Sequence, residues 1–349
     1  MELIIGLLFV TLAGLGTGTG AWPFKVIKNI HFEQWMFYSM GFAIVIYPWT
    51  IFLLGVPDPI LLIKTVGFRT LIISNLLTTA WGMANVLYMI CVVRIGAALT
   101  GAILSALGMS VGVTMPLILK GSGLFTKSPD LFSTPGILIM VGLVIIIIGV
   151  TLVSIAGFGR EKILKNESGE TQKKQASGDF RQGLLLVLLA GVLSCGLGLS
   201  FVYGQGSIIA AAKQQGAGGF AANFAVWALV CVGGAIVNVG YAAFWMTKKK
   251  TWNLLFARKD EFLISLVAAA QFIISVTLMG SGMVYLGILG ASVGYGIQQS
   301  VQVLGNQIVG FVGGEWKGVK GIPRRTMYIA LGLILIAVII FAYSNTLTY

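Results

Sequence analysis

Residues 131–159, LFSTPGILIMVGLVIIIIGVTLVSIAGFG, form a stretch of 29 residues without Asp, Glu, Lys or Arg. About 20 consecutive apolar residues span a bilayer as a helix, and a charge near the bilayer centre is costly. This stretch therefore predicts a transmembrane helix. Eight other uncharged stretches are long enough to span, and they cover residues 3–24, 34–57, 70–93, 95–119, 182–212, 214–247, 262–314 and 326–349.

One of these stretches is too long for a single helix. Residues 262–314 number 53, and the glycine-containing segment Met279-Gly280-Ser281-Gly282, together with Gly287, offers a natural break. Dividing the stretch there gives ten helices in all. We therefore expect an all-α polytopic membrane protein with ten transmembrane helices.

The overall composition agrees with this expectation. Hydrophobic residues make up 57% of the 349 residues and charged residues 10%, against roughly 25% charged residues in soluble domains. The mean hydropathy is +0.94. These values exclude a soluble globular protein and a disordered one. The net charge of +12 does not indicate nucleic acid as a partner, because the basic residues lie in short loops between apolar stretches.

The distribution of the basic residues predicts the orientation in the membrane. Loops that follow odd-numbered helices carry 18 of the 23 Lys and Arg residues. Because Lys and Arg concentrate in cytoplasmic loops, both termini should lie outside and the loop 159–182 in the cytoplasm. The expected location is a bacterial inner (plasma) membrane, with lipid as the surrounding partner.

The layout of the helices indicates a duplication. Residues 1–158 hold five helices, residues 159–182 form a charged linker, and residues 183–349 hold five more. Residues 6–14 and 183–191 are identical at seven of nine positions. Because five is an odd number, the second half enters the membrane from the opposite face, as in the inverted repeats of many secondary transporters. Coincidence between two Leu-rich helices is the alternative explanation.

Uncharged polar residues at membrane depth indicate a binding site, since each is costly unless it is paired or faces water. In 70–93 they recur at helical spacing on one face. Similar stripes occur in 214–247 and, most densely, in the second half of 262–314, where Tyr295 and Gln299 also belong to the stripe. The candidate substrate-binding residues are Trp81, Asn85, Tyr88, Asn223, Trp227, Asn238, Gln298, Gln302 and Asn306.

Amides beside indole and phenol rings suit a neutral, hydroxyl-rich small molecule. Amides supply both donors and acceptors to hydroxyl groups, and aromatic faces pack on the apolar side of a sugar ring. The alternative is that these residues only hydrogen-bond helices to one another. The density of the last stripe favours a water-filled cavity.

Acidic residues are absent from the middle of every predicted span, and the weak candidates for proton coupling are therefore acids near span ends, Glu2, Asp260 and Glu315. The sequence contains no metal-binding cluster, nucleotide-binding loop or nucleophile–base arrangement. We expect no cofactor, no metal site and no enzyme activity.

Several segments together resemble the L-rhamnose–proton symporter family of the drug/metabolite transporter superfamily. The resemblance extends nearly end to end and keeps the same order. It rests on Pro23-Phe24-Lys25 with Lys28, Pro48-Trp49, Trp81-Gly82 with Asn85, Gly233-Gly234-Ala235-Ile236-Val237-Asn238 with Gly240, Gly310, Gly313-Gly314-Glu315-Trp316, and Arg324-Arg325.

This resemblance implies two inverted five-helix repeats around a central sugar-binding cavity, with the proton as co-substrate. We therefore expect a secondary-active sugar transporter that takes up L-rhamnose or a related monosaccharide by alternating access. An uncoupled sugar facilitator and an amino-acid or drug exporter of the same superfamily are the alternatives. A membrane sensor or assembly subunit is a further one, although no sizeable extramembrane module is present. The sequence carries no signal for an oligomeric state.

Overall fold

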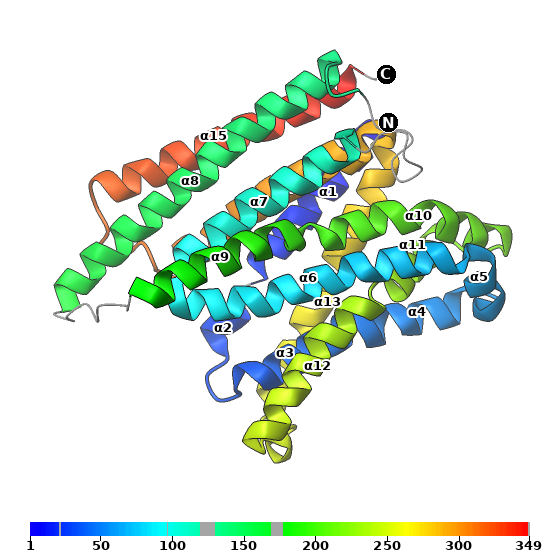
Figure 1. Ribbon diagram of the computed structural model, residues 1–349, viewed down its shortest axis with the longest axis horizontal. Coiled ribbons are helices and arrows are strands. Elements are labelled where there is room, and N and C mark those ends of the chain that lie inside the picture. Colours follow the sequence, from blue (N-terminus) through cyan, green and yellow to red (C-terminus); the bar gives the residue numbers. More distant parts are fainter. Residues whose placement is uncertain (21, 96, 119–129, 169–176, 348–349) are drawn as a thin grey trace.

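A computed structural model describes residues 1–20, 22–95, 97–118, 130–168 and 177–347, and within these ranges the chain is helical without any β-strand (Figure 1). Seven helical segments are long and apolar enough to cross a membrane, and a bent pair makes an eighth. The prediction of an all-α, multi-pass membrane protein is confirmed. The seven segments are Glu2–Thr19, Phe32–Gly55, Phe68–Cys91, Thr134–Ile163, Arg181–Gln214, Lys259–Tyr285 and Ile322–Thr346, and the bent pair is Gly219–Val230 with Val232–Lys249.

The first part of the chain begins with the long helix α1 and ends with the long helix α8. Its elements are α1 (Glu2–Thr19), α2 (Pro23–Val26), α3 (Phe32–Gly41), the π-helical turn η1 (Phe42–Ile46), α4 (Tyr47–Gly55), α5 (Pro59–Val66), α6 (Phe68–Ile95), α7 (Ala97–Ile118) and α8 (Thr134–Ser168).

The second part begins with α9 and ends with α15, which lies along α8 (Figure 1). Its elements are α9 (Ser177–Ser194), α10 (Gly196–Gln214), α11 (Gly219–Val230), α12 (Val232–Lys249), η2 (Trp252–Leu254), α13 (Lys259–Tyr285), η3 (Gly287–Leu289), η4 (Gly290–Gly294), α14 (Tyr295–Val312) and α15 (Ile322–Thr346).

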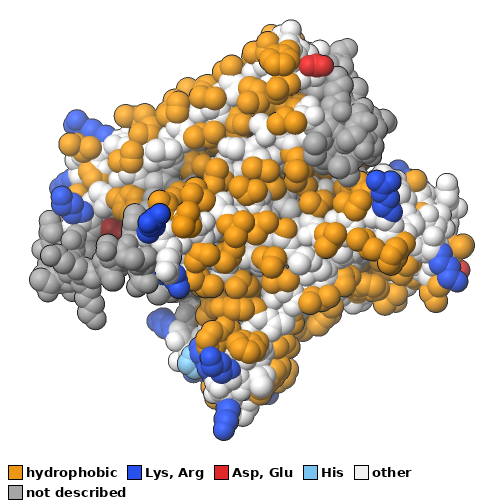
Figure 2. Space-filling model, viewed as in Figure 1, with side chains coloured by type: hydrophobic (Ala, Val, Ile, Leu, Met, Phe, Trp, Pro, Cys, Tyr) orange, Lys and Arg blue, Asp and Glu red, His pale blue; other side chains and the backbone are white. Residues whose placement is uncertain are grey.

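The surface of the helices is apolar where lipid would contact it. Leu54, Ile236 and Ile339 are 84%, 69% and 66% exposed, which a soluble protein avoids over large areas. Figure 2 shows hydrophobic side chains over the middle of one face, with Lys and Arg at its edges. This arrangement fits a bundle whose flanks are embedded in a membrane.

Two interruptions of helices have an identifiable cause, one in the adjoining sequence and one in a neighbouring helix. Before Pro48, the chain takes one π turn, in which the N–H of Tyr47 bonds to the carbonyl of Phe42. Proline lacks an N–H and crowds the preceding turn, and a wider turn accommodates it.

The second interruption lies at Cys231, where α11 and α12 meet at 58°. The Asn75 side chain of α6 donates to the carbonyl of Leu229 at 2.9 Å and accepts from the N–H of Gly233 at 2.7 Å. The Thr78 hydroxyl donates to the carbonyl of Val230 at 2.6 Å. A helix break within a membrane is stable when side chains satisfy the freed backbone groups in this way.

Close packing of α1 on α14 depends on a glycine. A Cβ atom at Gly18 would lie 2.3 Å from the carbonyl oxygen of Gln302. Small residues let helix backbones approach each other in a membrane. The α1–α14 contact places Thr17 beside the polar stripe of α14.

The structure corrects one predicted break. Helix α13 continues through Gly280 and Gly282, and the chain breaks after Tyr285, with Gly287 at φ +65°. Gly280 is needed for packing, because a Cβ there would lie 2.3 Å from the ring of Phe201. In addition, α8 extends through residue 168, so the first part of the predicted linker 159–182 is helical, and residues 169–176 lie outside the described residues.

Candidate functional site

A cavity of about 690 Å³ lies between the helices, with walls from α1, α3, α6, α7, α9, α10, α12, α13 and α14. It brings together seven of the nine predicted substrate-binding residues from three helices that are distant in sequence. Those seven are Trp81, Asn85, Tyr88, Asn238, Gln298, Gln302 and Asn306. The polar stripes of α6 and α14 therefore face one common space.

One wall of the cavity comes from α6 and α12. Trp81, Asn85 and Tyr88 follow one another along the continuous helix α6, so their spacing places them on the same face. The Asn85 Nδ2 donates to Asn238 Oδ1 at 3.1 Å, and the Asn238 Nδ2 donates to the carbonyl of Gly234 at 2.8 Å. Asn238 is thereby fixed, while the Asn85 carbonyl oxygen remains available to a hydroxyl donor.

A stacked aromatic pair forms part of the cavity wall. The ring of Trp81 lies on that of Phe272 from α13, with centroids 6.2 Å apart and planes inclined by 18°. Both side chains line the cavity. They offer flat apolar surfaces for the C–H face of a sugar ring.

The facing wall comes from α14, assisted by α1. The Gln298 Nε2 donates to Thr17 Oγ1 at 2.9 Å and to Gln302 Oε1 at 3.2 Å. The Gln299 Nε2 donates to the hydroxyl of Tyr295 at 3.2 Å. These amides are ordered by one another and by Thr17, which leaves part of their hydrogen-bonding capacity for a ligand.

Gln298 has one atom that the protein does not satisfy. Its side chain is buried, and within the described chain its Oε1 has no hydrogen-bond partner. Leaving a buried acceptor unpaired costs about 1–3 kcal/mol. A ligand hydroxyl in the cavity would remove this cost by donating to Gln298 Oε1.

The rest of the lining is largely apolar. Five methionines face the cavity, Met36, Met40, Met89, Met109 and Met279. Their flexible side chains adapt to irregular apolar shapes. No charged residue is among those that line the cavity in the described part of the chain, so the arrangement suits a neutral ligand with one polar and one apolar side.

Asn223 and Trp227 do not line this cavity, and their predicted continuity with Asn238 in one stripe is wrong. The bend at Cys231 separates α11 from α12, so a stripe drawn across residues 214–247 does not keep one face. The Asn223 Nδ2 donates to Ser281 Oγ at 2.9 Å, and Trp227 is fully buried against Phe201.

Sequence reasoning missed several polar residues near the site, among them Gln271 on α13, which does not line the cavity but holds the end of α1. Its Nε2 donates to the carbonyl of Gly16 at 2.7 Å and to Thr19 Oγ1 at 2.9 Å, and its Oε1 accepts from Trp22 Nε1 at 2.7 Å. Its only signal in the sequence was a single amide in the middle of a predicted span. Trp35 and Thr17 line the cavity without belonging to a polar stripe.

The three acids considered for proton coupling lie away from the cavity. Glu2 is exposed at the start of α1. Asp260 forms an exposed ion pair with Arg258 at 3.0 Å. Glu315, between α14 and α15, pairs with both Lys25 and Arg160.

The two cations beside Glu315 set its ionisation. Burial raises the pKa of this carboxyl, but hydrogen bonds from Lys25 and Arg160 outweigh that effect and hold the pKa below its ordinary value. An opposite charge within contact distance favours the ionised form. Glu315 is therefore a carboxylate in this arrangement.

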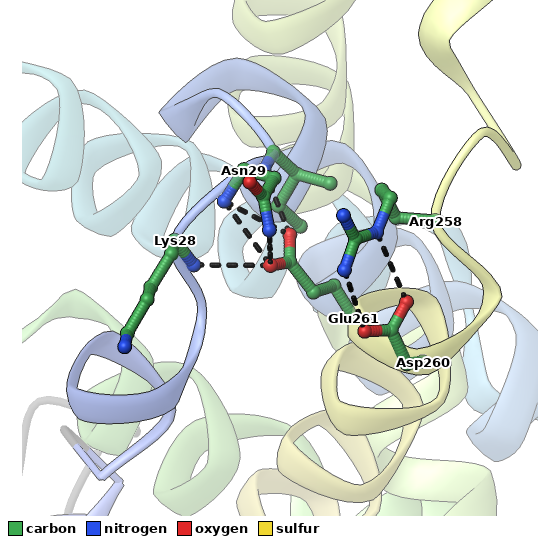
Figure 3. A network of polar contacts seen from close by, with 6 residues as sticks. Lys28, Asn29, Arg258, Asp260 and Glu261 are labelled. Carbon is green, nitrogen blue, oxygen red and sulfur yellow. Dashed lines mark hydrogen bonds and ion pairs between the residues drawn. The ribbon is translucent and has the colours of Figure 1, made fainter.

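Glu261 is a buried acid that the sequence analysis did not single out. It is 3% exposed and accepts backbone N–H bonds from Lys28, Asn29 and Ile30 at 3.1, 3.1 and 2.8 Å, plus one from the Asn29 side chain at 2.7 Å (Figure 3). These bonds fix the segment between α2 and α3 onto the start of α13. Their partners are more than 230 positions away in the sequence, so no local pattern indicates them.

An uncharged cavity with polar side chains on two walls, inside a multi-pass helical membrane protein, is typical of a secondary transporter. Residues 1–346 match the family of L-rhamnose-proton symport proteins, and the chain belongs to this family. The resemblance inferred from the sequence is confirmed. Membership also places the chain among transport proteins and not among enzymes.

Individual relatives agree with the family assignment. The chain is 26% identical over 330 residues, or 90% of each sequence, to an L-rhamnose-proton symporter of Pectobacterium carotovorum. It is equally similar to that of Pectobacterium atrosepticum. A Yersinia pestis L-rhamnose-proton symporter is 24% identical over 242 residues, which are 68% of this chain and 66% of the relative.

Proposed function

We propose that this chain carries L-rhamnose together with protons across a bacterial inner membrane by alternating access. The observation that carries the proposal is the cavity itself, in which the amides of α14 face Trp81, Asn85 and Tyr88. Its polar and apolar walls match a deoxy sugar, which has hydroxyl groups on most of its ring and a methyl group at one end. The names of the similar proteins supply the particular sugar and the coupled ion.

The ten-helix, two-repeat fold supports alternating access. Ten spans result when α7 and the η4–α14 segment are added to the eight that are long and apolar enough. Exchanging the halves maps α1 onto α9–α10, α6 onto α13, α7 onto α14 and α8 onto α15. Contacts between helices agree with this exchange. The contact of α1 with α13 corresponds to that of α6 with α9, and the contact of α7 with α8 corresponds to that of α14 with α15. The contact between α8 and α15 maps onto itself.

The aligned starts of the halves support the same exchange. Extending the match of residues 6–14 with 183–191 pairs Thr17 with Ser194, and both residues line the cavity. We therefore place the repeats at 1–158 and 183–349, in opposite orientations. Substrate sites at the interface of such repeats are typical of secondary transporters.

The orientation follows from the basic residues, with both termini outside. The cavity reaches from the middle of the bundle to the end where Phe32, Trp35 and Met89 lie. This end carries Lys25, Arg94 and Lys249 and is the proposed cytoplasmic one. The arrangement is then the inward-facing state of the carrier.

Among the acids considered, Glu315 is the best placed to carry the coupled proton. It connects the segment after α1 to α8 through Lys25 and Arg160, next to the end of α14. A carboxyl held ionised by two cations suits an inward-facing state that has released its proton to the cytoplasm. Neither Glu2 nor Asp260 connects two distant helices in this way.

Uptake into proteoliposomes tests the proposal. The panel is L-rhamnose, L-fucose, D-glucose, D-ribose and an amino acid, each with and without an imposed pH gradient. We expect L-rhamnose to accumulate only with the gradient, and E315Q to exchange L-rhamnose without accumulating it. Equilibration that ignores the gradient would make the chain a facilitator. Movement of the amino acid alone would make it an exporter.

A further inference from the structure

A second group of polar side chains lies on α10, α11 and α13, beyond the bend at Cys231 and outside the cavity. Asn223 is 4% exposed, Trp227 is fully buried and Thr277 is 6% exposed. Ser281 lies one turn after Thr277, and Gln205 lies one turn after Phe201. Neither the sugar cavity nor the proton site uses these residues.

Several polar atoms of this group have no partner. Within the described chain, no hydrogen bond is made by Trp227 Nε1, Asn223 Oδ1, Thr277 Oγ1 or Gln205 Oε1. Buried polar groups are paired in the great majority of cases. Four unpaired atoms on three neighbouring helices therefore need an explanation, and interhelical hydrogen bonding does not provide one.

The group is closely packed in this conformation. The Asn223 Nδ2 donates to Ser281 Oγ at 2.9 Å. The rings of Phe201 and Trp227 stack with centroids 4.7 Å apart and planes inclined by 22°. On the other side of Phe201, α13 approaches so closely that a Cβ at Gly280 would lie 2.3 Å from the ring.

The chemistry of this group repeats that of the open cavity. Both combine an indole, a stacked phenyl ring, an asparagine amide and a hydroxyl. In the cavity these are Trp81, Phe272, Asn85 and Thr17. In the second group they are Trp227, Phe201, Asn223 and Ser281. Indole N–H, amide and hydroxyl groups hydrogen-bond sugar hydroxyls, and the stacked ring faces a sugar ring.

We infer that Asn223, Trp227 and Ser281 form a second sugar-binding site, which is closed here and becomes accessible from the opposite side of the membrane when the cavity closes. The inference rests on the proposed transport function and extends it. The unpaired atoms are then the donors and acceptors that meet the sugar at its entry. Their lack of partners is a property of the closed state alone.

Thiol labelling tests the accessibility without using any sugar. S281C on α13 and the matched variant S105C, which lines the cavity, are each made in the full-length chain. The native cysteines Cys91, Cys195 and Cys231 are buried, and the unsubstituted protein gives the background. A membrane-impermeant maleimide is applied to intact cells and, separately, to inverted vesicles.

We expect S281C to react in intact cells and S105C in inverted vesicles. Reaction of both from the same side, or no reaction of S281C above background from either side, would overturn the inference. Because this readout needs no transport, it remains decisive even if L-rhamnose proves not to be the substrate.

Transport kinetics test the binding role. W227F keeps an aromatic ring in the stack and removes an N–H that has no partner, so it breaks no hydrogen bond, and the smaller ring should lower the melting temperature only modestly. The KM for external L-rhamnose in intact cells should rise at least fivefold. The control is W245F near the C-terminal end of α12, where the ring faces the ammonium of Lys248, and its KM should stay unchanged. An unchanged KM in both W227F and N223A would contradict a binding site here.

Discussion

Helices α7 and α14, which the proposed repeat relates to each other, both line the cavity, yet they contribute different chemistry. Helix α14 presents Gln298, Gln299, Gln302 and Asn306, whereas α7 presents Leu104, Ser105 and Met109. One of these helices therefore gives the cavity a polar surface and the other a largely apolar one. In the proposed repeat, two corresponding helices then share their place in the packing while only one of them specialises in recognition.

The first prediction concerns helix packing at two glycines, and it should give the largest effect on stability. A Cβ at Gly18 of α1 meets the backbone oxygen of Gln302 at 2.3 Å, whereas a Cβ at Gly191 of α9 meets the Leu107 side chain at 2.7 Å and a backbone oxygen, that of Ile103, only at 3.3 Å. Because a backbone yields less than a side chain, G18A should destabilise the protein by about 3 kcal/mol and G191A by about 1 kcal/mol. Thermal unfolding in detergent measures both, and equal effects would contradict the difference in backbone approach.

The second prediction concerns how α14 and α7 each contribute to binding L-rhamnose. Q298A removes the hydrogen bonds to Thr17 and Gln302 and the acceptor that awaits a ligand hydroxyl. The loss should be about 2 kcal/mol of binding, which corresponds to roughly 30-fold weaker affinity for L-rhamnose. L104A on α7 removes only apolar contact and should change affinity by less than about fivefold.

Isothermal titration of the purified variants with L-rhamnose checks this prediction. Expression level and melting temperature serve as controls for folding. Equal losses in Q298A and L104A would show that the α14 amides do not dominate recognition.

The third prediction concerns the stability of the protein at acid pH, to which Glu315 in the loop after α14 contributes, and its effect should be the smallest. Because the pKa of Glu315 lies below its ordinary value of 4.5 in the folded chain, the carboxylate contributes stability above pH 4.5. That contribution is lost as the pH falls through the lowered pKa. The group is partly exposed, so the effect should stay below about 1 kcal/mol.

Melting temperatures between pH 7 and pH 3 measure this contribution. E315Q should start lower at pH 7 and show a flatter profile below pH 4.5 than the unsubstituted protein. Identical profiles would mean that the Lys25 and Arg160 contacts add nothing to stability.

The fold class followed from the sequence because uncharged stretches mark spans directly. The stripe of α6 also met its expectation, since α6 is one continuous helix and regular spacing keeps Trp81, Asn85 and Tyr88 on one face. The same reason holds for Gln298, Gln302 and Asn306 on α14. Local periodicity predicts a shared face wherever the helix is unbroken.

Residue spacing did not predict which side chains share a face where contacts with another helix bend the chain. The bend at Cys231 is held by Asn75 and Thr78 of α6, so the spacing within residues 214–247 did not show that Asn223 lies away from the cavity that Asn238 lines. The expected break at Met279-Gly280-Ser281-Gly282 failed for a related reason. Those glycines accommodate neighbouring side chains, and a sequence does not distinguish a glycine that packs from one that ends a helix.

The contacts of Glu261 and Gln271 have a consequence for how this molecule moves. Glu261 fastens residues 28–30 to the start of α13, and Gln271 fastens the end of α1 to the same helix two to three turns further on. The two attachments hold α13 against residues 28–30 and against the end of α1. We therefore expect α1 and α13 to move together when the carrier changes state, so that the motion of the bundle lies between this pair and the helices around it.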